Sequence, residues 1–144
     1  MPLNGPVSSG DLFVFYGLLK QGAKGMPDDI NLNAAGEFLG PARFMGEMYG
    51  AGGFPAVVNG QTLCHGVRYR LQDASIARAL DAFEDVVPGD PKYSLYMRIR
   101  IPLLNDAGKL SGDQAWIYWY NQPVTGFRKI EDGNWPLNAG QARK

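Results

Sequence analysis

The sequence predicts an α+β fold in a single domain, with mostly short strands and one helix. The chain has 144 residues, close to the size of one ordinary domain with one hydrophobic core. Runs rich in β-branched and aromatic residues recur at close spacing, separated by clusters of Gly, Pro and Asn. One stretch, residues 73–87, changes to the periodicity of an amphipathic helix. A composition that is 45% hydrophobic and 19% charged can bury a core and argues against disorder.

The first elements are a leader, a buried strand and a loop. Residues 1–10 are rich in Pro, Gly and Ser, so we expect a disordered leader there and one domain over residues 11–144. Residues 12–16 form a dense aromatic and β-branched run, which predicts a buried strand that stops at Gly17. Residues 20–33 hold several Gly, Pro and Asp residues, which predicts a loop, a candidate lid, with at most one short helix.

Strands and one helix fill the rest of the domain. We expect strands over residues 36–40, 42–49, 55–58, 63–71, 93–103 and 115–120, the last two paired as a hairpin. Between them, residues 73–87 place Ile76, Leu80 and Phe83 on one stripe of a helix. Asp73 stands before this stripe and is a suitable N-cap.

Several chemically tempting residues have a simpler structural interpretation. Cys64 and His65 are adjacent in a predicted strand, so they point to opposite faces, and we expect a packed cysteine rather than a thiol catalyst. Arg98 and Arg100 share the polar face of their strand with Tyr96, which predicts a solvated face with one ion pair. Four aromatic residues of the last strand are expected to pack in the core and at the edge: Trp116, Tyr118, Trp119 and Tyr120.

Charge and cysteine content exclude several classes of function. Lys plus Arg number 14 and Asp plus Glu number 14, so no global field attracts nucleic acid or an anionic membrane. One cysteine cannot form an internal disulfide, and with one histidine it cannot assemble a Cys/His zinc site. No apolar run approaches the roughly 18 residues of a membrane helix. The first residues lack the basic and apolar regions of a signal peptide, so we expect a cytoplasmic protein.

Glu84 is the most informative carboxylate. At about 100° per residue it lies about 40° beyond Leu80, so it borders the apolar stripe of the helix. Asp81, Glu84 and Asp85 crowd the C-terminal end of the helix, where the helix dipole disfavours negative charge. Like charges, the helix end and partial burial all raise the pKa of a carboxyl toward the range that suits a general base. The alternative is a solvated acidic helix end with no chemical role.

The segment Tyr16-Gly17-Leu18-Leu19 is a second candidate site. A strand that ends in Gly lets successive backbone N–H groups point into a concavity, where they can bind a carboxylate. The alternative is an ordinary turn, because many strands end in Gly only to reverse direction.

These segments occur in a characteristic order along the chain. Residues 13–22 contain a Tyr-Gly-x-Leu loop, residues 80–84 a Leu-Asp-x-x-Glu helix end, and residues 96–98 a Tyr-x-Arg strand. Phe54-Pro55-Ala56-Val57-Val58, Ala115-x-x-Tyr118 and Gly133-Asn134-Trp135 complete the set. Over about residues 11–135 the chain resembles the gamma-glutamylcyclotransferase-like family.

The resemblance implies a fold, a reaction and a set of site residues. The fold would be a small mixed β-barrel with a flanking helix. The reaction would convert a γ-glutamyl amino acid or γ-glutamyl amine to 5-oxoproline and a free amine, with no metal or other cofactor. The amine half of the substrate stays open: the compound could be glutathione, a γ-glutamyl dipeptide, γ-glutamyl-lysine or another γ-glutamylated metabolite. The resemblance makes Glu84 the general base and acid, has Tyr16, Gly17, Leu18 and Leu19 hold the glutamyl group, and makes Tyr118 a wall or hydrogen-bond donor.

Two features depart from the family pattern. Leu18 stands where the loop usually has Thr or Ser, and residues 86–92 follow the glutamate like an insertion. The missing hydroxyl favours an alternative function, a non-catalytic small-molecule-binding or interaction protein with the same fold and pocket. Backbone N–H groups need no hydroxyl to bind an anion, and Glu84 is retained, so the sequence favours the cyclotransferase.

Overall fold

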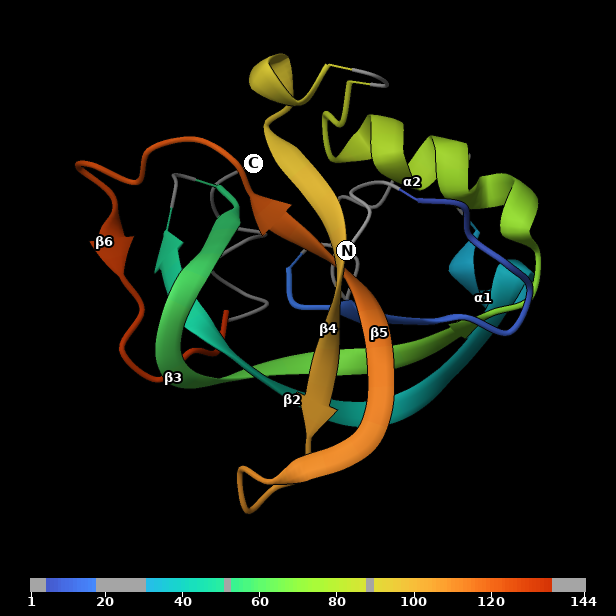
Figure 1. The fold of residues 1–144 in the computed structure, drawn as a ribbon, viewed down its shortest axis with the longest axis horizontal. Coiled ribbons are helices and arrows are strands. Elements are labelled where there is room, and N and C mark those ends of the chain that lie inside the picture. Colours follow the sequence, from blue (N-terminus) through green and yellow to red (C-terminus); the bar gives the residue numbers. More distant parts are fainter. Residues whose placement is uncertain (1–4, 18–30, 51–52, 88–89, 136–144) are drawn as a thin grey trace.

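Strands dominate the structure, a computed structural model that describes residues 5–17, 31–50, 53–87 and 90–135. In chain order the elements are β1 (Leu12–Phe15), α1 (Leu32–Ala35), β2 (Gly36–Gly50), β3 (Pro55–Leu71), a 3₁₀-helix (Ala74–Ile76), α2 (Ala77–Phe83), a second 3₁₀-helix (Pro91–Tyr93), β4 (Tyr96–Leu104), β5 (Leu110–Tyr120) and β6 (Arg128–Lys129). The expected α+β fold is confirmed (Figure 1).

Five of the strands pair in a ring. β1 lies between β3 and β5, antiparallel to β3 and parallel to β5, while β4 is antiparallel to β5. β2 then joins β4 through the pair Arg43 and Leu104 and returns to β3 along its whole length, which closes the ring. β6 adds to the far end of β2. In Figure 1 the β4–β5 hairpin crosses in front of β2 and β3, as in the two layers of a small barrel.

Two long strands replace the four short ones expected over residues 36–71. β2 and β3 stay paired through two register shifts, one between Phe38 and Gly40 and one between Gly46 and Glu47. The first shift leaves one extra residue in β2 and the second leaves three in β3, while the ladder continues on both sides, so Gly40 and Gly60 mark irregularities and not strand ends. The prediction of four separate strands was wrong for this reason.

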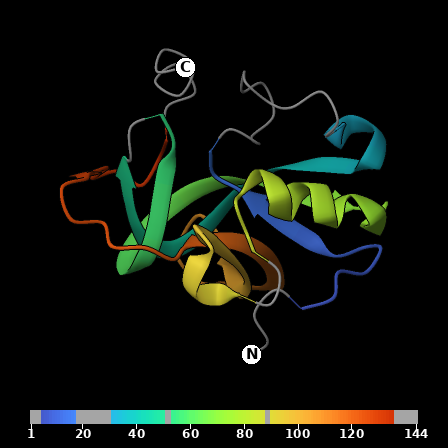
Figure 2. The ribbon, with the colours of Figure 1, turned by 90° about the horizontal axis from the view of Figure 1, so that it is seen from above.

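The helix begins as expected and ends early. Asp73 is the N-cap of the first 3₁₀-helix, and its side chain accepts a hydrogen bond from the backbone N–H of Ser75 at 3.0 Å. α2 follows and ends at Phe83, so the expected extent to residue 87 was wrong. Leu80 is fully buried in the core cluster that also holds Phe13 of β1, and Figure 2 shows α2 lying alongside that strand.

The expected hairpin of β4 and β5 is confirmed, but the polar face of β4 is not solvated. Tyr96 and Arg98 are only 5% and 4% exposed, because residues of α2 and β5 pack on that face. The prediction of a solvated face was therefore wrong for these two residues. Arg100 is half-exposed and pairs with Asp11 at 3.2 Å, which is the ion pair expected there.

The cysteine and the aromatic residues of β5 pack as expected. Cys64 is fully buried, and this burial, with a smaller effect of the Glu47 charge, raises the pKa of its thiol to about 11. Three of the four aromatic side chains are buried in the core, and the fourth packs against it: Trp116, Tyr118, Tyr120 and, partly buried, Trp119.

Parts of the predicted leader and lid lie outside the described residues. Residues 5–10 form no helix or strand, and the Gly5 carbonyl accepts a hydrogen bond from Nη1 of Arg98 at 2.8 Å. The division into a leader over residues 1–10 and one domain beyond it stays a prediction. Of the candidate lid, residues 20–30 lie outside the described part of the chain, and α1 begins at Leu32.

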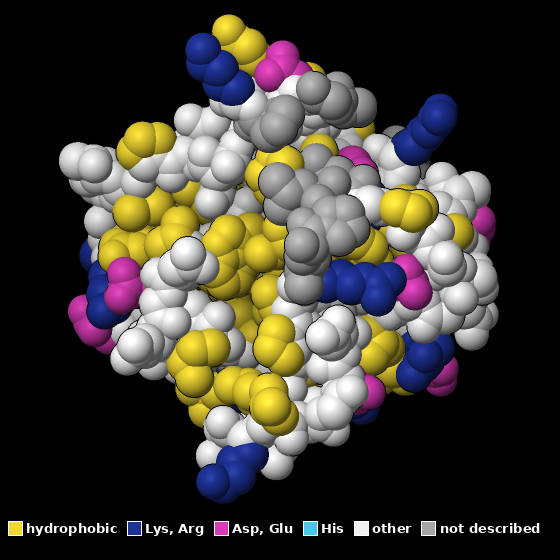
Figure 3. All heavy atoms as spheres, in the orientation of Figure 1, with side chains coloured by type: hydrophobic (Ala, Val, Ile, Leu, Met, Phe, Trp, Pro, Cys, Tyr) yellow, Lys and Arg dark blue, Asp and Glu magenta, His cyan; other side chains and the backbone are white. Residues whose placement is uncertain are grey.

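On the face shown in Figure 3, charges of both signs are scattered around the rim and hydrophobic side chains gather toward the centre. Within the described ranges, every helix is too short or too polar to cross a membrane.

Candidate active site

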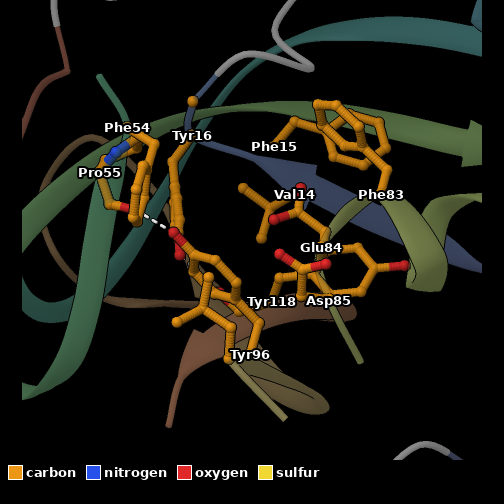
Figure 4. A pocket seen from close by; sticks show the side chains of 12 residues that line it. Val14, Phe15, Tyr16, Phe54, Pro55, Phe83, Glu84, Asp85, Tyr96 and Tyr118 are labelled. Carbon is orange, nitrogen blue, oxygen red and sulfur yellow. Dashed lines mark hydrogen bonds between the residues drawn. The ribbon is translucent and has the colours of Figure 1, made fainter. Parts of the chain in front are cut away.

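A pocket of about 200 Å³ opens where four elements meet: the end of β1, the start of β3, the C-terminal end of α2 and the start of β4. Its lining is mostly aromatic and apolar, with two carboxylates: Val14, Phe15, Tyr16, Gly17, Phe54, Pro55, Phe83, Glu84, Asp85, Leu95, Tyr96 and Tyr118. Figure 4 shows the carboxyl of Glu84 pointing toward the middle of these side chains. A concave, mainly apolar site with a few polar groups is typical of small-molecule binding.

The backbone at the end of α2 places Glu84 at this pocket. Asp85 has a φ of 55°, in the left-handed region, and turns the chain away from the helix axis. Its N–H donates to the carbonyl of Ala82 at 3.1 Å, and the N–H of Val86 donates to the carbonyl of Asp81 at 2.9 Å. This pair of bonds is a Schellman motif, which satisfies the last carbonyls of a helix. Glu84 is therefore the C-cap, and its side chain lines the pocket at the end of the helix.

Burial and charge together perturb the carboxyl of Glu84. Loss of solvent is the largest cause and raises its pKa from 4.5 to about 8, with the charges of Asp85 and then Asp81 adding to the effect. The C-terminal end of the helix dipole acts in the same direction. The carboxyl therefore changes between its neutral and ionised forms near physiological pH, the range that suits a general acid or base.

Asp81 belongs to a network that sequence reasoning missed. Its carboxylate accepts hydrogen bonds from Arg98, through Nε at 2.9 Å and Nη2 at 3.1 Å, and from the hydroxyl of Tyr118 at 2.7 Å. The sequence placed Asp81 among crowded acids at a helix end and Arg98 on a solvated face. The signal that could have joined them was the Asp of the Leu-Asp-x-x-Glu segment and the Arg of the Tyr-x-Arg segment, two opposite charges on elements expected to pack together.

The tyrosine hydroxyls around the pocket donate hydrogen bonds to acceptor atoms of the protein. Tyr16 donates to the carbonyl of Tyr118 and Tyr96 to the carbonyl of Pro55, each at 2.5 Å. Tyr118 donates to Asp81. Burial first, and neighbouring carboxylate charge second, hold the pKa of Tyr16 and Tyr118 well above the ordinary value, so both remain neutral. Tyr118 is therefore a wall of the pocket whose proton is already engaged, and not a free donor.

Gly17 allows the end of β1 to approach β3 closely. A Cβ atom built on Gly17 would lie 2.7 Å from Cγ of Pro55, too close for any side chain. Pro55 in turn accepts the hydrogen bond of Tyr96, so this contact ties three walls of the pocket together. Of the predicted site residues, Tyr16, Gly17, Glu84 and Tyr118 meet here, whereas Leu18 and Leu19 lie outside the described residues.

The sequence did not single out the apolar walls of the pocket. In the sequence, Phe83 stands out only on the apolar stripe of the helix and Tyr96 on a face predicted to be solvated, and Leu95 lies within a predicted strand without further signal. Phe54 and Pro55 appeared only as one segment of the family resemblance. In the part of the chain that the structure describes, no three His, Cys, Asp or Glu side chains gather into a cation site.

The raised pKa of Glu84 predicts a pH-dependent change in stability. The folded protein binds this proton more tightly than the unfolded chain, so ionisation of Glu84 destabilises the fold as pH rises from about 4.5 through about 8. We expect Glu84→Gln to match the wild type near pH 4 and to be more stable near pH 9, by on the order of 2 kcal/mol. Thermal melting at the two pH values measures this, and an equal offset at both would contradict it.

Two comparisons of sequence identify relatives. A sequence model of the family described as "Gamma-glutamyl cyclotransferase, AIG2-like" matches residues 12–137. The "Gamma-glutamylcyclotransferase family protein ytfP" of Citrobacter rodentium is 33% identical over 89 residues, which are 62% of this chain and 66% of that protein. YtfP of Escherichia coli K12 is 32% identical over 89 residues, which are again 62% of this chain and 66% of that protein. The match thus spans just under two thirds of the length of these relatives.

Solved structures share the fold. The solution structure of ytfP from Escherichia coli has a TM-score of 0.59 and 26% identity, covering 86% of this chain and 95% of that one. The crystal structure of an AIG2-like protein from Mus musculus has a TM-score of 0.62 and 19% identity, covering 90% of each chain, and supports the fold alone. With a family model that spans most of its length, the chain belongs to the gamma-glutamyl cyclotransferase, AIG2-like family.

Proposed function

We propose that this protein cyclises γ-glutamyl compounds, releasing 5-oxoproline and a free amine. The observation that carries the proposal is a carboxyl, Glu84, with a pKa of about 8 inside a pocket walled by Tyr16, Gly17 and Tyr118. Family membership supplies the reaction class. The substrate is a small molecule that fits the pocket through its glutamyl half.

The reaction needs one base and one site for developing negative charge. The α-amino nitrogen of the glutamyl group attacks its own γ-carbonyl carbon, so a new C–N bond closes a five-membered ring. The γ-amide C–N bond then breaks. The proton lost by the attacking nitrogen passes to Glu84 and from there to the departing amine, so atoms and charge balance without a redox partner.

The environment of Glu84 suits this double role. A base with a pKa near the working pH can accept a proton and return it, and such catalysis contributes about 10²–10⁴-fold in rate. Burial first, then the charge of Asp85 and that of Asp81, make Glu84 a stronger proton acceptor than an ordinary carboxylate. These surroundings therefore support removal of one proton from the neutral α-amino group as it attacks.

Backbone N–H groups are the donors that the proposal assigns to the oxyanion. The protons of Tyr16, Tyr96 and Tyr118 are engaged with protein acceptors, which leaves the end of β1 as the source of donors. We assign this role to the N–H of Gly17 and, by resemblance to the family loop, to those of Leu18 and Leu19. Fixed donors in a water-poor site stabilise developing charge strongly.

Removing the base should stop the reaction. Glu84→Gln keeps the size of the side chain but cannot accept a proton, so we expect turnover of γ-glutamyl compounds to fall at least about 100-fold. Formation of 5-oxoproline from a panel of γ-glutamyl amino acids and amines measures this, with thermal melting as the check on folding. A folded variant that keeps more than about a tenth of wild-type turnover would remove Glu84 from the role of base.

The pH dependence of the reaction should follow the carboxyl of Glu84. The base works in its ionised form, so we expect kcat/KM to rise with pH and to reach half its maximum near pH 8. Asp85→Asn tolerates the same left-handed backbone and removes a like charge, so it should move the midpoint to lower pH. An unchanged midpoint in this variant would assign the profile to the substrate amine.

Leu18→Thr separates the cyclotransferase from a non-catalytic relative. If backbone N–H groups bind the anion, adding the usual hydroxyl should change KM or the preferred amine only modestly, because one neutral hydrogen bond contributes about 0.5–1.5 kcal/mol. The maximal rate on a good substrate should change little. A wild type inert on every γ-glutamyl compound, beside a Leu18→Thr variant that turns over, would instead show a binding protein.

A further inference from the structure

Arg98 is a buried cation that connects to the Tyr118 wall of the pocket through Asp81. Its side chain is 5% exposed and makes a two-pronged ion pair with Asp81, Nε to Oδ1 at 2.9 Å and Nη2 to Oδ2 at 3.1 Å. Nη1 donates to the carbonyl of Gly5 at 2.8 Å, and the guanidinium lies 4.6 Å from the centre of the Trp116 ring. A two-pronged ion pair that is removed from water is a strong interaction, and it fixes the orientation of both side chains.

The ion pair reaches the pocket by two routes. Asp81 precedes Glu84 by three residues, so the two carboxyls share one face of the helix end. The same Oδ1 atom of Asp81 that contacts Arg98 also accepts the hydroxyl proton of Tyr118 at 2.7 Å, and Tyr118 is a pocket wall. The first route is electrostatic, because the charge of Asp81 acts on Glu84. The second is structural, because the hydrogen bond from Tyr118 to Asp81 fixes the position of the Tyr118 ring.

We propose that Asp81 and Arg98 are positioning residues, which fix the Tyr118 wall and set the charge behind Glu84. Their catalytic consequence rests on the function proposed above, but their effect on Glu84 does not. Arg98 offsets the negative charge of Asp81, so that the carboxyl of Glu84 can still ionise near physiological pH. Without Arg98, Asp81 would become a second uncompensated negative charge beside Glu84, in addition to Asp85.

The groups facing Glu84 define what such a change should do. Asp81 and Asp85 come from α2 and its C-terminal turn, and the neutral phenols of Tyr16, Tyr96 and Tyr118 come from β1, β4 and β5. Among these described groups the two carboxylates are the charged ones. Removing one half of the ion pair should therefore move the titration of Glu84 in one direction, and removing the other half should move it in the opposite direction.

The test follows the titration of Glu84 directly, by NMR of protein labelled with ¹³C at glutamate carboxyls. The Glu84 signal is identified by its loss in Glu84→Gln. We expect Asp81→Asn to lower the midpoint by roughly one pH unit and Arg98→Gln to raise it by a similar amount. Arg98→Lys keeps the charge and should leave the midpoint near that of the wild type. Opposite shifts cannot arise from a purely structural role.

Arg100→Gln is the matched control. Arg100 lies two residues along the same strand, its guanidinium is also 4.6 Å from the centre of the Trp116 ring, and it pairs with Asp11 instead of Asp81. Its removal should leave the midpoint of Glu84 unchanged. A rise in Arg100→Gln equal to that in Arg98→Gln, or no movement in Asp81→Asn, would overturn the proposal.

Folding and function are separated by the same set of variants. If Arg98→Gln does not fold, Asp81→Asn and Arg98→Lys still decide the question, because each keeps a hydrogen-bonding partner in place. If the wild type turns over no γ-glutamyl compound, the proposed reaction fails while the titration still reports on the ion pair. If turnover is present and the midpoints do not move, the ion pair has no positioning role and the reaction stands.

Discussion

Helix α2 ends because Asp85 adopts a left-handed backbone, and the site depends on that ending. With φ at 55°, Asp85 allows the N–H groups of residues 85 and 86 to cap the carbonyls of Ala82 and Asp81. A non-glycine residue in this region carries a conformational cost of about 1 kcal/mol or more, which the surrounding packing must offset. Leu80 and Val86 supply such packing, since both are buried in one core cluster on either side of the turn. The stop leaves Glu84 at the C-cap, where its side chain lines the pocket.

The ring of strands brings the other half of the site to this helix end. β1 pairs with β3 on one side and with β5 on the other. Tyr16, which follows β1, and Tyr118 of β5 therefore become neighbours although they are more than 100 residues apart in the sequence. The close approach of Gly17 to Pro55 removes space between β1 and β3. Rigid strand ends that converge on one cavity suit a site whose groups must keep fixed positions during reaction.

The carboxyls of α2 show how one short helix can hold two acids in different states. Asp81 finds Arg98 and Tyr118 as partners and belongs to a satisfied buried ion pair. Glu84 lies among apolar side chains and tyrosine phenols beside the charges of Asp85 and Asp81, and burial with these charges raises its pKa to about 8. Two acids three residues apart therefore differ in their electrostatic surroundings, because Asp81 reaches the guanidinium of Arg98 and Glu84 does not share that ion pair.

The sequence alone determined the α+β class, the first strand, the β4–β5 hairpin and the candidate base at a helix end, because each depends on local periodicity or on short motifs. Local pattern could not show that β2 and β3 run through their glycines, since a bulge is stabilised by its partner strand. It also assigned Arg98 to solvent, because alternation identifies two faces of a strand but not which element covers each. Only the tertiary structure decided that α2 lies there and that Asp81 meets Arg98, since pairing of distant charges depends on packing and not on sequence spacing.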